Sequence, residues 1–192
     1  MQWNIPGTVL TAPLEEASQI EEKLRAMFLG GGMVLSQVAS VTGLESYTIQ
    51  NWVKRGFLAN PQGKKYTLRQ LCRILNINML KDALPMEEIC GLMTYINGHL
   101  DDESDDLIDD SELYFLFLRI AAHHRQMEDT QGRDRYIREV LAEYRESIPG
   151  ARERVEKVLE VMLTAWAAAL LRKKAMSMVE ALKMTDLKGE FI

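Results

Sequence analysis

Apolar residues recur at helical spacing along most of the chain, and glycine or proline separates these runs into distinct elements. The first run predicts a helix over residues 14–29, with glutamates in its early turns and Gly30-Gly31-Gly32 at its end. Three glycines cannot sustain a helix without a large entropic penalty. We therefore place a boundary here and assign residues 1–33 to an N-terminal helical arm.

Two short helices follow, and because Thr42-Gly43 forms a turn between them, they predict a helix-turn-helix. The second begins near Glu45 or Ser46, either of which can cap it. Its apolar face comprises Ile49, Trp52 and Val53, and we assign Trp52 to the core. The opposite face, which we expect to be free to touch a ligand, carries Tyr47, Gln50, Asn51 and Lys54.

Residues 57–66 read as a small β-wing: an extended piece at Phe57-Leu58, a turn at 60–63 and a returning strand at 64–66. Thr67 caps a helix that runs to about residue 80, and Pro85 opens another that ends at Asn97-Gly98. The order helix, helix, wing, helix, helix predicts a winged helix-turn-helix over residues 34–98.

An acidic loop, 101–110, precedes three further helices, predicted at 111–128, 133–147 and about 151–184. These make residues 99–192 a helical module for dimerisation or sensing. The predicted fold class is thus mainly α, with a small β-wing, an N-terminal helical arm and a C-terminal helical module.

The last helix carries an apolar stripe that is long for a domain of this size. Two interpretations remain open: the stripe is the interface of a homodimer, or it packs inside the chain against the 111–128 helix. The interface residues of the first interpretation are Val155, Leu159, Met162 and Trp166.

Charge is strongly segregated, because residues 46–81 contain no acidic residue within a chain of net charge −5. The positive side chains of this basic window are Lys54, Arg55, Lys64, Lys65, Arg69, Arg73 and Lys81. Such segregation indicates one surface suited to an anion, and the surrounding pattern favours nucleic acid. The acidic loop is expected either to be solvated or to fold against the basic face as an internal competitor for DNA.

About 65 positions resemble the winged helix-turn-helix of the MerR-like transcriptional regulators. The resemblance lies in residues 35–39, in Thr42-Gly43-Leu44, in residues 48–52 with Lys54 and 56–58, in residues 66–71 at the end of the wing and the start of the third helix, and in residues 84–89 at the entry to the fourth. The whole chain also resembles an uncharacterised bacterial family built on such a head. The resemblance implies that the second helix enters the major groove of DNA and that the wing contacts phosphates.

The sequence departs from the MerR-like pattern at three places, and each lowers the expected affinity for DNA. Gln50 stands where arginine is common, Glu45 lies near the helix end that approaches phosphate, and the wing is short. Gln50 and Asn51 suit adenine, whereas Lys64, Lys65 and the Tyr66 hydroxyl suit phosphates. The predicted DNA-binding residues are Ser46, Tyr47, Gln50, Asn51, Lys54, Arg55, Lys64, Lys65 and Tyr66.

Other chemistry has little support in the sequence. There is no nucleophile motif or phosphate-binding loop, so we expect no enzyme activity and no cofactor. Cys72 and Cys90 read as buried thiols of a cytoplasmic protein, and His123-His124 with Glu128 makes a poor metal site because adjacent helix positions diverge. The longest apolar run is too short for a membrane span.

The predicted function is therefore that of a sequence-specific DNA-binding transcriptional regulator. Its partners would be double-stranded DNA, a second copy of the chain and an effector, small molecule or protein, that the sequence does not identify. The alternative is a protein-interaction adaptor that uses the helix-turn-helix as a scaffold. The negative net charge and Glu45 favour this alternative.

Overall fold

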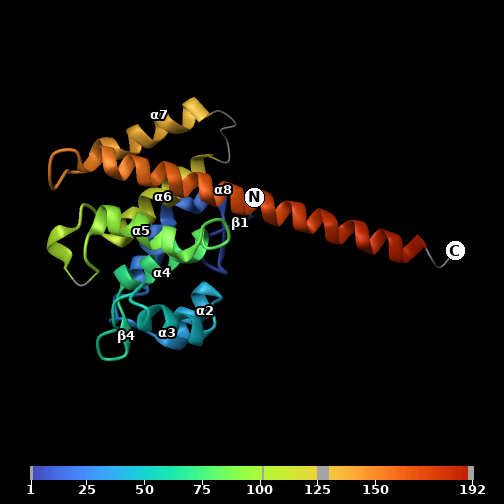
Figure 1. Cartoon of the computed structure of the whole chain (residues 1–192), viewed down its shortest axis with the longest axis horizontal. Helices are drawn as coiled ribbons and strands as arrows, with labels where there is room; N and C mark the ends of the chain where they lie inside the picture. Colours follow the sequence, from blue (N-terminus) through green and yellow to red (C-terminus); the bar gives the residue numbers. More distant parts are fainter. Residues whose placement is uncertain (1, 101, 125–129, 190–192) are drawn as a thin grey trace.

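The fold is mainly helical, as predicted, in a computed structural model that describes residues 2–100, 102–124 and 130–189 (Figure 1). Two short strand pairs accompany the helices: β1 with β2, and β3 with β4. The α-helices of these described residues are α1 Ile20–Ala26, α2 Leu35–Thr42, α3 Ser46–Lys54, α4 Leu68–Leu80, α5 Met86–Asn97, α6 Asp110–His124, α7 Thr130–Val140 and α8 Ala151–Gly189. Short 3-10 helices lie at Leu14–Gln19, Glu103–Asp105 and Leu141–Glu143.

The N-terminus forms a hairpin that the sequence did not predict. Strands β1 (Gln2–Asn4) and β2 (Thr11–Pro13) pair antiparallel, and Trp3 between them is fully buried. Gly7, in the connecting turn, has φ +75°, and a Cβ there would lie 2.4 Å from the Leu75 carbonyl oxygen. Asn78 of α4 donates to the carbonyl oxygen of Gly7 at 2.8 Å. The hairpin is therefore docked on the central helix.

The predicted helix over 14–29 is shorter in the structure. A 3-10 helix occupies Leu14–Gln19, and the α-helix proper, α1, spans Ile20–Ala26. Turns then lead to the glycine triplet, where Gly31 donates to the Phe28 carbonyl oxygen at 3.0 Å. The proline at position 13 fixes the entry to this segment, since its ring restrains the backbone at the start of a helix.

Strand β4 (Lys65–Tyr66) pairs with β3 (Met33–Val34), which corrects the prediction that it returns along Phe57-Leu58. The register places Met33 opposite Tyr66. A Cβ on Gly32 would lie 2.6 Å from the Tyr66 carbonyl oxygen, so this glycine permits close approach of the two strands. The triplet is thus more than a break between helices.

Helix α4 lies at the centre of the molecule and packs against α2, α5, α6 and α8 (Figure 1). Thr67 caps it as predicted, because its side chain accepts from the Gln70 amide and the Gln70 side chain accepts from the Thr67 amide. The buried cluster around α4 includes residues of all three predicted segments, such as Trp3, Leu71 and Phe117. The segments therefore share a hydrophobic core.

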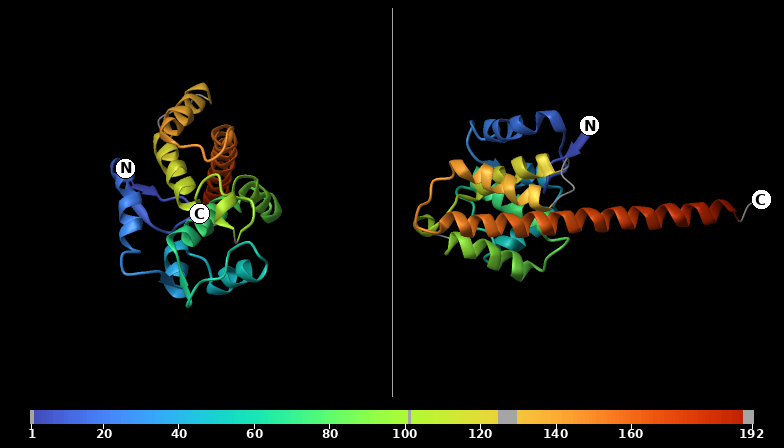
Figure 2. Two further views of the ribbon diagram at one scale, coloured as in Figure 1. Left: turned by 90° about the vertical axis from the view of Figure 1, so that its left-hand side faces the viewer. Right: turned by 90° about the horizontal axis from the view of Figure 1, so that it is seen from above.

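The apolar stripe of α8 packs inside the chain, which corrects its assignment as a dimer interface. Val155, Leu159 and Met162 are fully buried, and the Trp166 ring meets the Phe117 ring of α6 edge-on, with centroids 5.7 Å apart. This packing matches the alternative of an internal bundle. From residue 170 onward the described side chains of α8 are exposed, and beyond the contacts of Arg172 and Lys173 with Asp82 the helix projects into solvent (Figure 2).

Candidate nucleic-acid interface

The turn between α2 and α3 is built by Gly43, which has φ +69° and donates to the Ala39 carbonyl oxygen at 2.9 Å. The Thr42 hydroxyl donates to the Val38 carbonyl oxygen and accepts from the Leu44 amide, which holds the start of the next segment. A Cβ at Gly43 would collide with Val9 of the N-terminal turn. The N-terminal hairpin therefore supports the angle between α2 and α3.

Helix α3 separates its faces as predicted. Ile49 and Trp52 are buried, whereas Tyr47 is 70% exposed and Gln50 and Lys54 are also exposed. The N-cap residue is Glu45, and no side-chain cap is formed there, so the predicted capping by Glu45 or Ser46 is not seen at this end of the described helix. The exposed Glu45 carboxylate lies at the end that would approach a phosphate.

The loop of residues 58–64, called here the 58–64 loop, ends in a tight turn before β4. Lys65 donates its backbone amide to the Gln62 carbonyl oxygen at 3.0 Å, and Gly63 and Lys64 have φ +55° and +62°. Two positive φ values in succession are typical of a type I′ hairpin turn. A non-glycine residue in this region costs about 1–2 kcal/mol, so Lys64 is held there by the turn.

Tyr66 is less accessible than its predicted role suggests. Its side chain is buried, and burial raises the pKa of its hydroxyl. The neighbouring Lys64 and Lys65 are exposed, in keeping with a surface role. The two lysines are thus the more accessible of the predicted phosphate contacts, although Tyr66 also lines the groove between α3 and the 58–64 loop.

A groove of about 690 Å³ lies between α3 and the 58–64 loop and brings together part of the predicted set. Its lining residues are Val34, Leu35, Ser36, Gln50, Val53, Lys54, Asn60, Pro61, Lys64 and Tyr66. Ser46, Tyr47, Asn51, Arg55 and Lys65 do not line it, and the Arg55 guanidinium lies 4.5 Å over the Phe57 ring. Sequence reasoning missed Ser36 and Asn60, whose only signal was their position beside a predicted helix start and turn.

Two of the seven basic residues of the window are turned away from this groove. Arg69 pairs with Asp106 at 2.5 Å, and Arg73 pairs with the buried Asp110 at 3.3 Å. The acidic loop thus does fold against part of the basic window, although on α4 rather than on α3. In the part of the chain that the structure describes, Lys54, Lys64 and Lys65 form no ion pair.

The buried carboxyl groups of the acidic loop have altered proton affinities. Burial raises the pKa of Asp106 to about 6 despite the opposing Arg69 charge, and burial also raises the pKa of Asp110. Because the folded protein holds a proton on Asp106 more tightly than the unfolded chain does, this group stabilises the fold below about pH 4 relative to neutral pH. Its contribution falls as the pH rises through about 6.

Asp106→Asn is expected to remove this pH dependence. As the pH rises from 5 to 7, the parent should lose about 1 kcal/mol of unfolding free energy relative to the variant. Urea denaturation at a series of pH values measures it, with exposed Asp105→Asn as the control. A constant difference across that range contradicts the assignment.

The predicted histidine and cysteine features have other surroundings. The His123 ring stacks on Tyr136 with centroids 3.9 Å apart, whereas the side chain of His124 and all of Glu128 lie outside the described residues. Cys72 is buried, but Cys90 is only half-buried, which corrects that prediction. Over residues 2–100, 102–124 and 130–189, no group of three or more metal-ligating side chains is found, and no helix is long and apolar enough to cross a bilayer.

Comparisons with known proteins find one family model and one curated relative similar to part of the chain. Residues 31–117 match the family described as a domain of unknown function, DUF1836. The chain is similar to the uncharacterized protein YkrK of Bacillus subtilis (strain 168), with 32% identity over 97 residues. That match covers 47% of this chain and 42% of the length of YkrK, and no solved structure matches. The family match therefore includes the candidate interface, from β3 to the first half of α6, and gives it no function.

Proposed function

We propose that the chain is a sequence-specific DNA-binding transcriptional regulator with a MerR-like winged helix-turn-helix. The observation that carries the proposal is the groove between α3 and the 58–64 loop, where Gln50, Lys54 and Lys64 face the same space. A recognition helix beside a basic loop suits double-stranded DNA, since the helix reaches base edges while lysines bind phosphates. Regulation in the cytoplasm is part of the same proposal.

The local geometry supports this assignment in two further ways. Gly43 sets α2 and α3 at a tight turn, as a helix-turn-helix requires. The 58–64 loop, tied to the body by the pairing of β3 and β4, would serve as the wing. Lys64 of that loop and the adjacent Lys65 of β4 are exposed and have no acidic partner among the described residues, so their charge is available to phosphates.

A protein-interaction adaptor is the second candidate, and one observation favours it. The groove has apolar walls formed by Val34, Leu35 and Val53, which suit a peptide side chain better than a phosphate. Glu45 adds a negative charge at the start of α3. The two functions differ in their dependence on salt, because DNA binding releases counterions and apolar docking does not.

Binding to random duplex DNA is expected to weaken steeply with salt. The log–log slope should be about −0.9 per phosphate contacted, with about 4 to 8 contacts for a dimer. Lys64→Ala with Lys65→Ala should weaken binding to all sequences alike and reduce the slope by about 2 per pair of lysines lost. Fluorescence anisotropy between about 50 and 200 mM salt measures both effects.

The matched control for that experiment is Lys157→Ala with Lys174→Ala, two exposed lysines of α8 away from the groove. This control has the same net charge as the test variant, so a general charge effect weakens both equally. The DNA proposal would be wrong if the affinity for DNA did not change with salt, or if the two double variants lost the same affinity. It would leave the adaptor as the better assignment.

Base reading is a separate prediction that rests on the exposed face of α3. Gln50→Ala should cost about 1–3 kcal/mol at the preferred site and far less on random DNA, because a bidentate contact to adenine is lost. Asn51 is half-buried, so we expect Asn51→Ala to have the smaller effect of the two. A selection of genomic DNA supplies the preferred site, and equal losses on both DNAs would show that Gln50 does not read bases.

We further propose a homodimer, since two heads on a palindromic site give the specificity that one lacks. The buried stripe of α8 is not available for this contact, but the projecting part of the same helix is. Leu171, Met178 and Leu182 are exposed there at helical spacing. Light scattering at micromolar concentration should give a dimer for the parent and a monomer for Leu171→Glu.

A further inference from the structure

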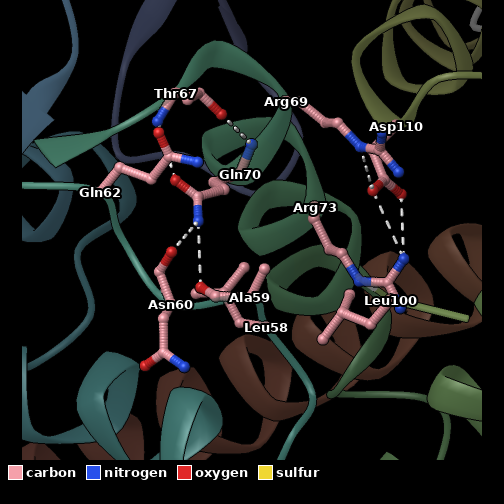
Figure 3. Close-up of a pocket in the computed structure, with 10 residues that line it drawn as sticks. All are labelled: Leu58, Ala59, Asn60, Gln62, Thr67, Arg69, Gln70, Arg73, Leu100 and Asp110. Atoms are coloured by element: carbon pink, nitrogen blue, oxygen red, sulfur yellow. Dashed lines mark hydrogen bonds and ion pairs between the residues drawn. The ribbon is translucent and has the colours of Figure 1, made fainter. Parts of the chain in front are cut away.

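A second cavity, of about 390 Å³, lies between the 58–64 loop, the start of α4 and the acidic loop (Figure 3). It is distinct from the groove beside α3, although Asn60 lines both. The residues around the cavity are Leu58, Ala59, Asn60, Gln62, Thr67, Arg69, Gln70, Arg73, Leu100 and Asp110. The 58–64 loop is therefore a wall shared by two spaces.

Positive groups dominate the α4 side of this cavity. Arg69 and Arg73 both line it, and their guanidinium groups converge on the Asp110 carboxylate at its edge (Figure 3). The N-terminus of the 13-residue α4, with Thr67 and Gln70, lines the same space, and a helix N-terminus favours anions. Together, two arginines and a helix end make a wall suited to an oxyanion.

Arg73 is only partly satisfied by the protein. Its Nε donates to the Phe57 carbonyl oxygen at 3.2 Å, and its Nη1 lies 3.3 and 3.4 Å from the two Asp110 oxygens. Charge-assisted contacts of this kind are usually about 2.7–2.9 Å. No partner of Nη2 is found in the described residues. This side chain, almost fully buried, retains a donor for a further acceptor.

The carboxylates near these arginines oppose an incoming anion, and the structure limits their effect. Among the described residues, Asp110 is the acidic residue that lines the cavity; only 1% of its side chain is exposed, and it lies near both arginines. Asp106 and Asp109 contact Arg69 outside the cavity lining. Since burial raises the pKa of both Asp106 and Asp110, these groups shed negative charge by proton uptake more readily than free carboxylates.

The same arginine connects the cavity to the DNA-facing loop. Arg73 donates to the Phe57 carbonyl oxygen at the base of the 58–64 loop, and the side-chain Nε2 of Gln70 donates to the carbonyl oxygens of Ala59 and Asn60 at 3.0 and 3.1 Å. A ligand that engages Arg73, or that touches Asn60 and Gln62, acts directly on the backbone of this loop. A shift of the loop backbone would also move Lys64 in the neighbouring groove.

We propose that this cavity is a regulatory site for a small oxyanion, a carboxylate or a phosphate, bound by Arg73, Arg69 and the N-terminus of α4 and sensed through the 58–64 loop. Oxyanion binding at this site does not depend on the proposed DNA-binding function. Its regulatory effect rests on the proposed DNA-binding function. The two parts are tested by separate measurements.

The first measurement is isothermal titration of the full chain with succinate and, separately, with inorganic phosphate, at ionic strength fixed with chloride. Neutral succinamide is the control for shape. We expect saturable binding of one of the two oxyanions and none of succinamide. The double variant Arg73→Gln/Asp110→Asn removes both buried charges together, so it leaves no unpaired ion in the core, and it should weaken binding at least about tenfold.

A second variant keeps the experiment decisive if the first fails to fold. Gln62→Glu places a negative charge at the exposed rim of the cavity and should weaken binding about three- to tenfold by repulsion. Lys157→Glu, which makes a larger charge change far from the cavity, should not. Absence of saturable binding by both oxyanions, or equal binding by Gln62→Glu and the parent, would overturn the site.

The second measurement repeats the DNA titration with and without the bound oxyanion. A change in affinity of about threefold or more in the parent, lost in Gln62→Glu, supports regulation through the loop. If the oxyanion binds and DNA affinity does not change, the regulatory part is wrong and the site remains. If the chain binds no DNA at all, the proposed function fails, and the first measurement still decides the site.

Discussion

Leu159→Glu is expected to leave the chain unfolded. Leu159 is fully buried in the bundle that α8 forms with α6 and α4, so a glutamate there would carry its charge into a dry core. That costs several kcal/mol for the charge in addition to the lost packing. A domain of this size is stable by only about 5–15 kcal/mol, so most of the stability is lost. Circular dichroism and thermal melting measure the outcome.

The matched control lies on the same helix. Leu171 is 68% exposed on the projecting part of α8, and Leu171→Glu should keep the helical signal and the melting temperature of the body. The two variants have the same chemistry and differ only in burial. A folded Leu159→Glu variant would mean that the stripe is a surface after all, and that its assignment as a dimer face was correct.

Trp52→Ala is expected to destabilise the fold by about 3–5 kcal/mol, because the indole is lost from a packed site and leaves a cavity. Trp52 is 5% exposed and belongs to the main buried cluster, and its carbonyl oxygen accepts from the Phe57 amide at 2.9 Å. The backbone hydrogen bond remains in the variant, so the expected loss comes from the packing of the indole. Urea denaturation of variant and parent gives the change in unfolding free energy.

Tyr47→Ala is the control for Trp52→Ala, since it removes an aromatic ring from the exposed face of the same helix. We expect it to change stability by less than about 0.5 kcal/mol and to act only on DNA binding. The assignment of Trp52 to the core would be wrong if Trp52→Ala were fully stable and failed only to bind DNA. In that case the indole would be a contact to bases.

The helices of the middle segment were predictable because local signals agree with one another. Thr67 with Gln70 forms a capping box, Gly43 ends α2, and Pro85 precedes α5. The two faces of α3 also followed from periodicity alone, since apolar and polar residues alternate with the helical repeat. These features involve residues within one or two turns of each other, and so the sequence contains them in full.

Features that depend on distant partners were not predictable in the same way. The strand that pairs with β4 lies more than thirty positions upstream, and the N-terminal hairpin is only three residues per strand. Strands this short do not produce a recognisable alternation of apolar and polar residues in the sequence. Tyr66 illustrates the consequence: its place beside two lysines suggested a surface role, but pairing with Met33 turns its side chain into the core.

The basic window shows the same division for the candidate site. The absence of acidic residues over 46–81 indicated an anion-binding surface, but it could not assign each charge to a side of the molecule. Two aspartates of the acidic loop, each 37 positions farther along the chain, pair with Arg69 and Arg73. Of the basic window, Lys54 and Lys64 line the groove beside α3, whereas Arg69 and Arg73 line a separate cavity at the start of α4.

The sequence by itself determined a mainly helical chain, the helix-turn-helix order of α2 and α3, and the concentration of positive charge near them. Local hydrogen bonding and periodicity specify such features without reference to the rest of the chain. Only the tertiary structure decided that the stripe of α8 is core and that its last part is free, because the same apolar spacing occurs in both parts. The difference is set by α6 and α4, which cover the first part of α8 and end before the second.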